Sequence, residues 1–188
     1  MQHVSVLRGL RIFGSDNRAT VSVELALTLP MLITLLGSGL EITNYVLIHQ
    51  KVERTSVTIS DLVAQSARMT ESQMTSLFSA TEYVMKPFDL ATDGNVVVSS
   101  ISASGGNPPV ISWQRSSGGG HNGSRFGAEG AAASLPAGLS VRDGENIIAC
   151  EAYYYYRPML FKGVIGETTL YRYAFFRPRF GKLDVIYP

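Results

Sequence analysis

The feature that most constrains this chain is an apolar block close to its N-terminus. Between Arg18 and Lys51 the only formally charged residues are Glu24 and Glu41. Residues 25–40 carry no charge and would form an α-helix about 24 Å long. A stretch this apolar has to be buried in a protein core or in a bilayer, because exposing it to water is unfavourable.

The block extends far enough to cross a membrane. About 20 apolar residues span a bilayer, and residues 25–40 alone fall short of that length. The helical pattern continues through residues 41–49, "EITNYVLIH", with Tyr45 where an interfacial aromatic side chain would lie. Pro30 is compatible with this interpretation, because membrane-spanning helices tolerate proline. We therefore expect a transmembrane helix over residues 20–48.

Two other interpretations compete with a retained membrane helix. A cleaved secretory signal would use residues 25–36 as its apolar region and "GSG" at residues 37–39 as its cleavage site. A buried core helix of a soluble domain is the other alternative. The retained helix is favoured, because the helical pattern does not stop where a signal peptide would be cut.

The charges that flank the block predict its orientation. The short N-terminal side has an excess of arginine, whereas the C-terminal side carries mixed charges, and such a bias keeps the N-terminal side in the cytoplasm. The N-terminal charges are Arg8, Arg11, Asp16 and Arg18, and the C-terminal charges are Lys51, Glu53 and Arg54. We expect residues 1–19 to form a basic cytoplasmic leader and the chain after the helix to lie outside the cytoplasm.

The length and composition limit the number of domains and the kinds of site that the chain can contain. The chain of 188 residues allows one modest domain with appendages, or two small ones. Its formal net charge is +1 without a broad basic field, so nothing indicates a nucleic-acid partner. Cys150 is the only cysteine, which excludes an intramolecular disulfide and a zinc site of paired cysteines. Its thiol is either a small buried apolar group or free to meet an intermolecular partner in an oxidising space.

Glu24 lies just inside the leading edge of the apolar block. It is either an ordinary glutamate in the first turns of a helix, where the helix dipole favours an anion, or a residue with a positively charged partner. A partner would matter because a charge at the centre of a span costs about 2.5–3.5 kcal/mol. If the chain were cut just before Thr20, the new α-amino group would be such a partner, and Glu24 would be the fifth residue of the mature protein.

The residues around Glu24 also match a known pattern. "RATVSVELALTLP", residues 18–30, resembles the N-terminal signature of TadE/TadG-like proteins, the pseudopilins or minor pilins of tight-adherence (Flp-type) pilus systems. Gly39-Leu40-Glu41 resembles the family's element near the end of the span, and "TISDLVAQSARMT" resembles a variant that follows it. The residues that fit the signature are Arg18, Thr20 to Val23, Glu24, Leu25, Ala26, Leu27 and Pro30.

The resemblance implies a function in pilus assembly at the bacterial inner membrane. It implies cleavage by a prepilin peptidase between Ala19 and Thr20, although the family usually has glycine before the cut. Glu24 would then pair with the amino terminus of a neighbouring subunit, and Glu41 would be a second carboxylate at the end of the span. The implied partners are other pilin or pseudopilin subunits, the inner-membrane assembly platform and membrane lipid, with the C-terminal domain in the periplasm.

Residues 49–86 are expected to be helical outside the membrane. Apolar residues recur at helical spacing from Lys51 to Arg68. A second helix would begin at "TESQ", residues 70–73, which resembles a capping box, and would end before Pro87. The apolar side chains of this segment are expected to pack on the sheet that follows, namely Leu62, Met74, Leu77, Phe78 and Val84.

Residues 87–188 are expected to be rich in β-structure. "NVVVSSISAS" and "PPVISWQRS" alternate around a Gly-Asn-Pro-Pro turn and predict a hairpin. "ENIIACEAYYYY" and "TTLYRYAFF" predict two more strands, neighbours in an antiparallel sheet. Between the pairs, the glycine-rich residues 117–134 are expected to form a mobile loop. The predicted fold is α+β and pilin-like, with the transmembrane helix continuing into helices that pack on a small antiparallel sheet.

The sequence offers no catalytic constellation. The three histidines, His3, His49 and His121, lack the spacing of a metal pair, so we expect neither an enzyme nor a cofactor. The tyrosines and phenylalanines of the last two strands point alternately to both faces of the sheet, so both faces should be partly covered. The alternative to a pilus subunit is a membrane-tethered extracytoplasmic domain whose sheet binds a ligand and whose helix is a passive anchor.

Overall fold

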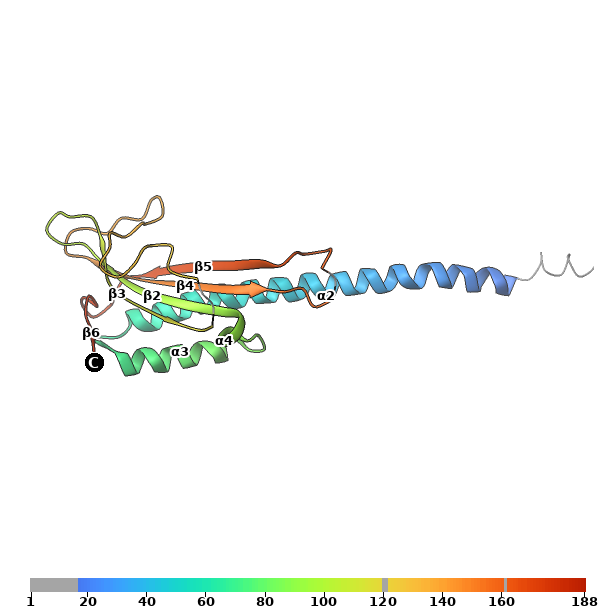
Figure 1. Ribbon diagram of the computed structural model, residues 1–188, viewed down its shortest axis with the longest axis horizontal. Helices are drawn as coiled ribbons and strands as arrows, with labels where there is room; N and C mark the ends of the chain where they lie inside the picture. Colours follow the sequence, from blue (N-terminus) through green and yellow to red (C-terminus); the bar gives the residue numbers. More distant parts are fainter. Residues whose placement is uncertain (1–16, 120–121, 161) are drawn as a thin grey trace, which may run out of the picture.

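The computed structural model describes residues 17–119, 122–160 and 162–188, with side chains from Thr20 onward. Most of the predicted leader, residues 1–19, therefore lies outside the described residues. A single helix, α2 (Asn17–Ala64, 48 residues), dominates the molecule. Figure 1 shows its first half projecting away from the rest of the chain and its second half lying along the sheet. At 1.5 Å per residue the whole helix is about 72 Å long.

A second helix follows a short connection, as the sequence predicts. β1 (Met69–Thr70) leads into α3 (Glu71–Met85). The predicted capping box is confirmed: the Thr70 hydroxyl accepts a hydrogen bond from the Gln73 backbone N–H (3.2 Å), and the Thr70 N–H donates to Gln73 Oε1 (3.0 Å). The helix ends before Pro87, because the residue that precedes a proline avoids helical geometry.

The rest of the chain forms a small antiparallel sheet. After the short helix α4 (Leu90–Asp93), the strands are β2 (Gly94–Ser102), β3 (Val110–Ser117), β4 (Asn146–Tyr156) and β5 (Thr168–Phe176). They lie in the order β3-β2-β4-β5, and every pair is antiparallel. The C-terminal strand β6 (Ile186–Tyr187) pairs with β1 in parallel. The predicted α+β class, the hairpin and the neighbouring strand pair are confirmed.

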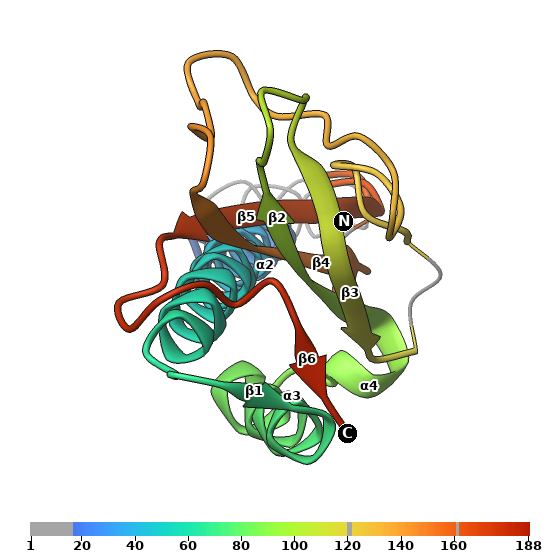
Figure 2. The same cartoon turned by 90° about the vertical axis from the view of Figure 1, so that its left-hand side faces the viewer.

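The larger core lies between the helices and one face of the sheet. In Figure 2, α2 runs beneath β4 and β5, while α3 and α4 lie below β2 and β3. Alternate residues of β2 and β4 point toward the helices, where they meet the buried C-terminal half of α2. Trp113 of β3 is buried in the same core and donates its indole N–H to the backbone oxygen of Leu183 at 2.7 Å. The second half of α2 is therefore part of the folded domain.

The opposite face of the sheet is covered by the connection between β3 and β4. Phe126 of this connection is 4% exposed and packs with Ile101, Ile111 and Ile147. The prediction that residues 117–134 form a mobile loop is wrong for the part around Phe126, because aromatic burial and hydrogen bonds attach it to the sheet. The prediction that both faces of the sheet are partly covered is confirmed.

Candidate functional site: the projecting half of the long helix

The first half of α2 presents a continuous apolar surface. Every described side chain from Thr20 to Leu36 is exposed, including Leu27 and Met31 at 72% each. Only 11% of the most apolar window of the helix is buried, whereas a core helix would be mostly buried. Residues 20–36 extend over about 25 Å. The helix is long and apolar enough to cross a membrane.

The folded domain begins to cover α2 before the end of the predicted span. Gly37 and Glu41 are buried, and Ile48 belongs to the core. Within residues 37–48 the other side of the helix stays exposed, with Leu40 at 63% and Leu47 at 48%. Residues 20–36 therefore project freely, while residues 37–48 lie with one side against the domain.

The residues predicted for processing and assembly lie at the free end of this surface. Ala19 and Thr20 are within α2, although the Ala19 side chain is not among those described. Glu24 is exposed, one turn after Thr20 and on the same side of the helix. Thr28 donates to the backbone oxygen of Glu24 (2.9 Å), and among the described side chains none pairs with the Glu24 carboxylate. An exposed carboxylate on an apolar helix can meet a partner from another molecule.

Glu41 has a different environment from Glu24. It is 1% exposed, and its carboxylate accepts hydrogen bonds from the Tyr156 hydroxyl and from the backbone N–H groups of Met159 (3.0 Å) and Leu160 (2.8 Å). Burial, followed by the hydrogen bond to Glu41, raises the pKa of Tyr156 well above its usual range. Tyr45 packs edge-on against Tyr156, with 5.1 Å between ring centroids. Glu41 thus joins α2 to the end of β4 and the loop that follows it.

A second buried carboxylate, Glu151 of β4, was missed by the sequence analysis. It is 0% exposed and accepts hydrogen bonds from the Ser124 hydroxyl, the Arg125 N–H (2.9 Å), and the hydroxyls of Tyr153 (3.0 Å) and Tyr171 (2.8 Å). Burial and the nearby carboxylate raise the pKa of both tyrosines above their usual range. The signal in the sequence was a single acidic residue among the apolar and aromatic residues 147–156. This cluster holds the β3–β4 connection against the sheet.

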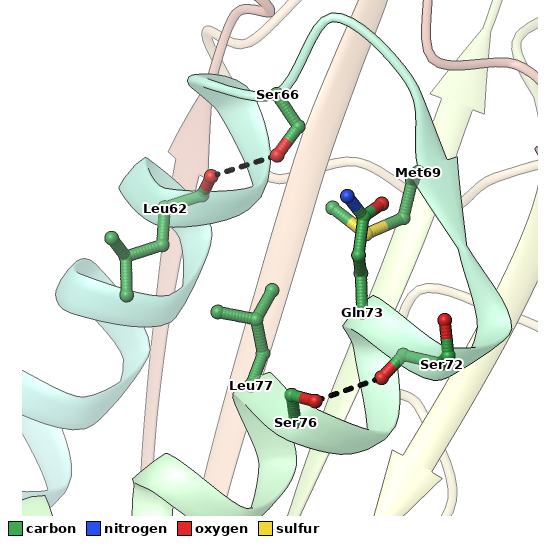
Figure 3. Close-up of a pocket in the computed structure, with 7 residues that line it drawn as sticks. All are labelled: Leu62, Ser66, Met69, Ser72, Gln73, Ser76 and Leu77. Atoms are coloured by element: carbon green, nitrogen blue, oxygen red, sulfur yellow. Dashed lines mark hydrogen bonds between the residues drawn. The ribbon is translucent and has the colours of Figure 1, made fainter.

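An open groove separates the C-terminal end of α2 from α3 (Figure 3). The sequence predicts that Leu62 and Leu77 pack on the sheet, but Leu62 is 40% exposed and both side chains line the groove. The groove has a volume of about 470 Å³, and its other lining residues are Ser66, Met69, Ser72, Gln73 and Ser76. The prediction is wrong for Leu62, whose side chain lies on the side of α2 that lines the groove beside α3. The prediction holds for Met74 and Phe78, whose side chains are buried.

Cys150 and the histidines are the remaining candidate residues. Cys150 is fully buried in the core between α2 and the sheet, and this burial raises the pKa of its thiol far above the usual value. Over residues 17–119, 122–160 and 162–188, no cluster of three histidine, cysteine or acidic side chains could hold a metal ion. His3 and His121 lie outside these ranges. The buried thiol is shielded from reagents and from other chains.

Comparison with known proteins does not assign the chain to a family. No family model matches the chain, and neither a curated protein nor a solved structure is similar to it. Its function has to be inferred from the residues and the geometry of α2.

Proposed function

We propose that this chain is a membrane-anchored structural or assembly subunit of a tight-adherence (Flp-type) pilus, a pseudopilin or minor pilin. The projecting half of α2 crosses the bacterial inner membrane, with the leader in the cytoplasm and the α+β domain on the periplasmic side. The observation that carries this proposal is the continuity of α2, which is exposed and apolar over residues 20–36 and then becomes the spine of the domain. One rigid element therefore connects the bilayer to the domain.

A passive anchor does not require such continuity, because a flexible linker would tether a domain equally well. In a helix-based filament, however, subunits pack through their projecting helices, and the position of each domain depends on a stiff connection. The side of α2 that faces away from the domain stays apolar beyond the bilayer-length segment, with Leu40, Ile42, Val46 and Leu47 exposed by 45–63%. This surface suits packing against neighbouring helices of the same kind.

Glu24 is the residue proposed to direct this packing. In the bilayer its charge is unfavourable unless a cation lies close to it. Cleavage between Ala19 and Thr20 would supply that cation as the α-amino group of a neighbouring subunit. Pairing at low dielectric is stronger than at an aqueous surface, so the pair favours ordered neighbours over isolated helices. The prepilin peptidase and the assembly platform are the proposed partners in this process.

The alternative function, a tethered domain that binds a ligand through its sheet, gains less support. The helices cover one face of the sheet, and the β3–β4 connection covers part of the other. The aromatic side chains that suggested a binding surface are largely in contact with each other and with Phe126, although Tyr173 is 45% exposed. Neither face of the sheet is open along its length.

A cross-linking experiment tests the assembly role. A cysteine introduced at the exposed position Leu27 should form disulfide-linked dimers in native membranes upon mild oxidation, because neighbouring helices approach each other there. Cys150 should not contribute, since it is buried, so the unmodified chain serves as the background control. Glu24→Gln in the Leu27→Cys chain should reduce the dimer yield and the number of pili while leaving membrane insertion unchanged.

Two outcomes would count against the proposal. Normal piliation and unchanged cross-linking in the Glu24→Gln variant would reject the assembly role of this carboxylate. Mass spectrometry of the mature chain provides the second measurement. A chain that begins at Thr20 supports processing, whereas an intact N-terminus would remove the α-amino partner proposed for Glu24.

A further inference from the structure

We propose that the described part of the connection between β4 and β5, residues 157–160 and 162–167, is a second membrane-contact element that lies in the periplasmic interface of the bilayer beside α2. We refer to these residues as the membrane-side loop. This inference rests on the proposed function to the extent that α2 must span the bilayer. Its occupant is the lipid interface itself, at the boundary between headgroups and acyl chains.

The position of the membrane-side loop follows from its attachment to α2. Figure 1 shows the β4–β5 connection at the end of the domain that faces the projecting half of α2. The Met159 and Leu160 N–H groups donate to Glu41 of α2, which fixes the loop at the height of that residue. Residues 20–40 extend over about 31 Å, and the hydrocarbon core of a bilayer is about 30 Å thick. If the span begins at Thr20, its outer boundary falls at the level of the loop.

The exposed side chains of the loop match this position. Met159 is 77% exposed, Leu160 58% and Val164 42%, so three apolar side chains lie on the surface of one short loop. Met159 and Leu160 also line a hollow of about 270 Å³ together with Leu40 and Asn44 of α2. The apolar surface of α2 therefore continues onto the membrane-side loop. A bilayer that covers this end of α2 would also cover the loop.

The charges of the loop allow this contact without requiring a particular headgroup. The Lys162 side chain is 80% exposed and that of Arg157 is 59% exposed, so both can extend toward headgroups. Each also has an acidic partner, with Lys162 Nζ 3.5 Å from Glu167 and an Arg157 guanidinium nitrogen 2.9 Å from Asp93. Because these acids offset much of the positive charge, insertion of apolar side chains is the main interaction, and a zwitterionic bilayer suffices.

The contact would define how the domain is held relative to the membrane. A helix that crosses the bilayer alone leaves the domain free to tilt and to rotate about the helix axis. A second contact, beside the helix and joined to it through Glu41, restricts both motions. Neighbouring subunits would then present their domains at the same height and in the same orientation, which is the geometry that ordered assembly needs.

Site-directed spin labelling of the full chain tests the inference. The chain is reconstituted at one copy per phosphatidylcholine nanodisc, and a nitroxide is placed at Met159→Cys, with buried Cys150 left in place. The label at residue 159 should collide more often with oxygen, which partitions into lipid, than with an aqueous nickel chelate. The matched control is Phe180→Cys, which is 69% exposed and follows Arg179, whose N–H donates to Ala64 at the far end of α2. At residue 180 the nickel chelate should collide more often.

A third label, at Leu29→Cys on the projecting half of α2, separates the two proposals. Lipid-like accessibility at residue 29 combined with aqueous accessibility at residue 159 would overturn the membrane-side loop and leave the proposed function standing. Aqueous accessibility at residue 29 would overturn both. If protection at residue 159 appears only when two copies share a nanodisc, a second copy covers the loop, and the lipid contact is refuted.

Discussion

Replacing Glu41 should destabilise the whole domain, although this residue lies at the end of an apolar helix. Its carboxylate accepts hydrogen bonds from the Tyr156 hydroxyl and from two backbone N–H groups of the membrane-side loop, and among the described residues these donors have no other acceptor. Tyr156 is 0% exposed, so in Glu41→Ala its hydroxyl would be left buried without an acceptor.

The magnitude follows from the exposure of the three donors. A buried hydroxyl without its partner costs about 1–3 kcal/mol. The Met159 and Leu160 N–H groups lie in part-buried contacts at the edge of the domain, where interfacial water can replace the carboxylate, so their loss adds only about 1 kcal/mol. We expect Glu41→Ala to lower the free energy of unfolding by about 2–4 kcal/mol. Glu41→Gln retains the volume and one acceptor oxygen and should cost roughly half as much.

The assay is urea unfolding of the full chain in detergent micelles, followed by the fluorescence of Trp113, which is 2% exposed in the core. A double-mutant cycle with Tyr156→Phe isolates the buried pair. Because the double variant has no orphaned hydroxyl, its loss should be smaller than the sum of the two single losses by about 1–2 kcal/mol. A change of less than about 0.5 kcal/mol in Glu41→Ala, or strict additivity in the cycle, would refute this account of Glu41.

Three further predictions concern the domain alone. Glu151→Ala should cost about 2–4 kcal/mol in the same unfolding assay, because it removes the acceptor of several buried neutral donors. Glu151→Gln is the isosteric control, and equal losses in both variants would contradict a role for the negative charge. Burial, and then the Arg172 guanidinium, lower the pKa of His49 below 6.5. As the pH falls, the unfolded chain therefore binds a proton at this residue before the folded chain does, and the free energy of unfolding should decrease below about pH 6.5. The same decrease in a His49→Gln variant would contradict this role of His49. Thr70→Ala removes the N-cap of α3 and should lower the free energy of unfolding by about 1 kcal/mol. Thr70→Ser retains the hydroxyl, so its thermal unfolding temperature should be close to that of the parent chain.

The helices and strands were predictable because their signals lie within a few residues of each other. The start of α3 depends on Thr70 and Gln73, three positions apart, and its end precedes Pro87. The apolar block of α2 is a run of consecutive residues without charge, and the strands show apolar and polar residues that alternate with a period of two. These features depend on local backbone geometry and on the need to bury apolar surface, and both can be read along the chain.

The partners of the buried carboxylates could not be read in this way. Glu41 bonds to groups 115–119 positions away, and Glu151 to residues in two separate segments. The sequence places Glu24 at the start of the apolar block and Glu41 at its end, but it does not show that the domain encloses Glu41 while Glu24 stays exposed on the helix. The order of the strands and the packing of α2 on β4 and β5 decide which carboxylate is buried, since burial depends on elements brought together only in the folded chain.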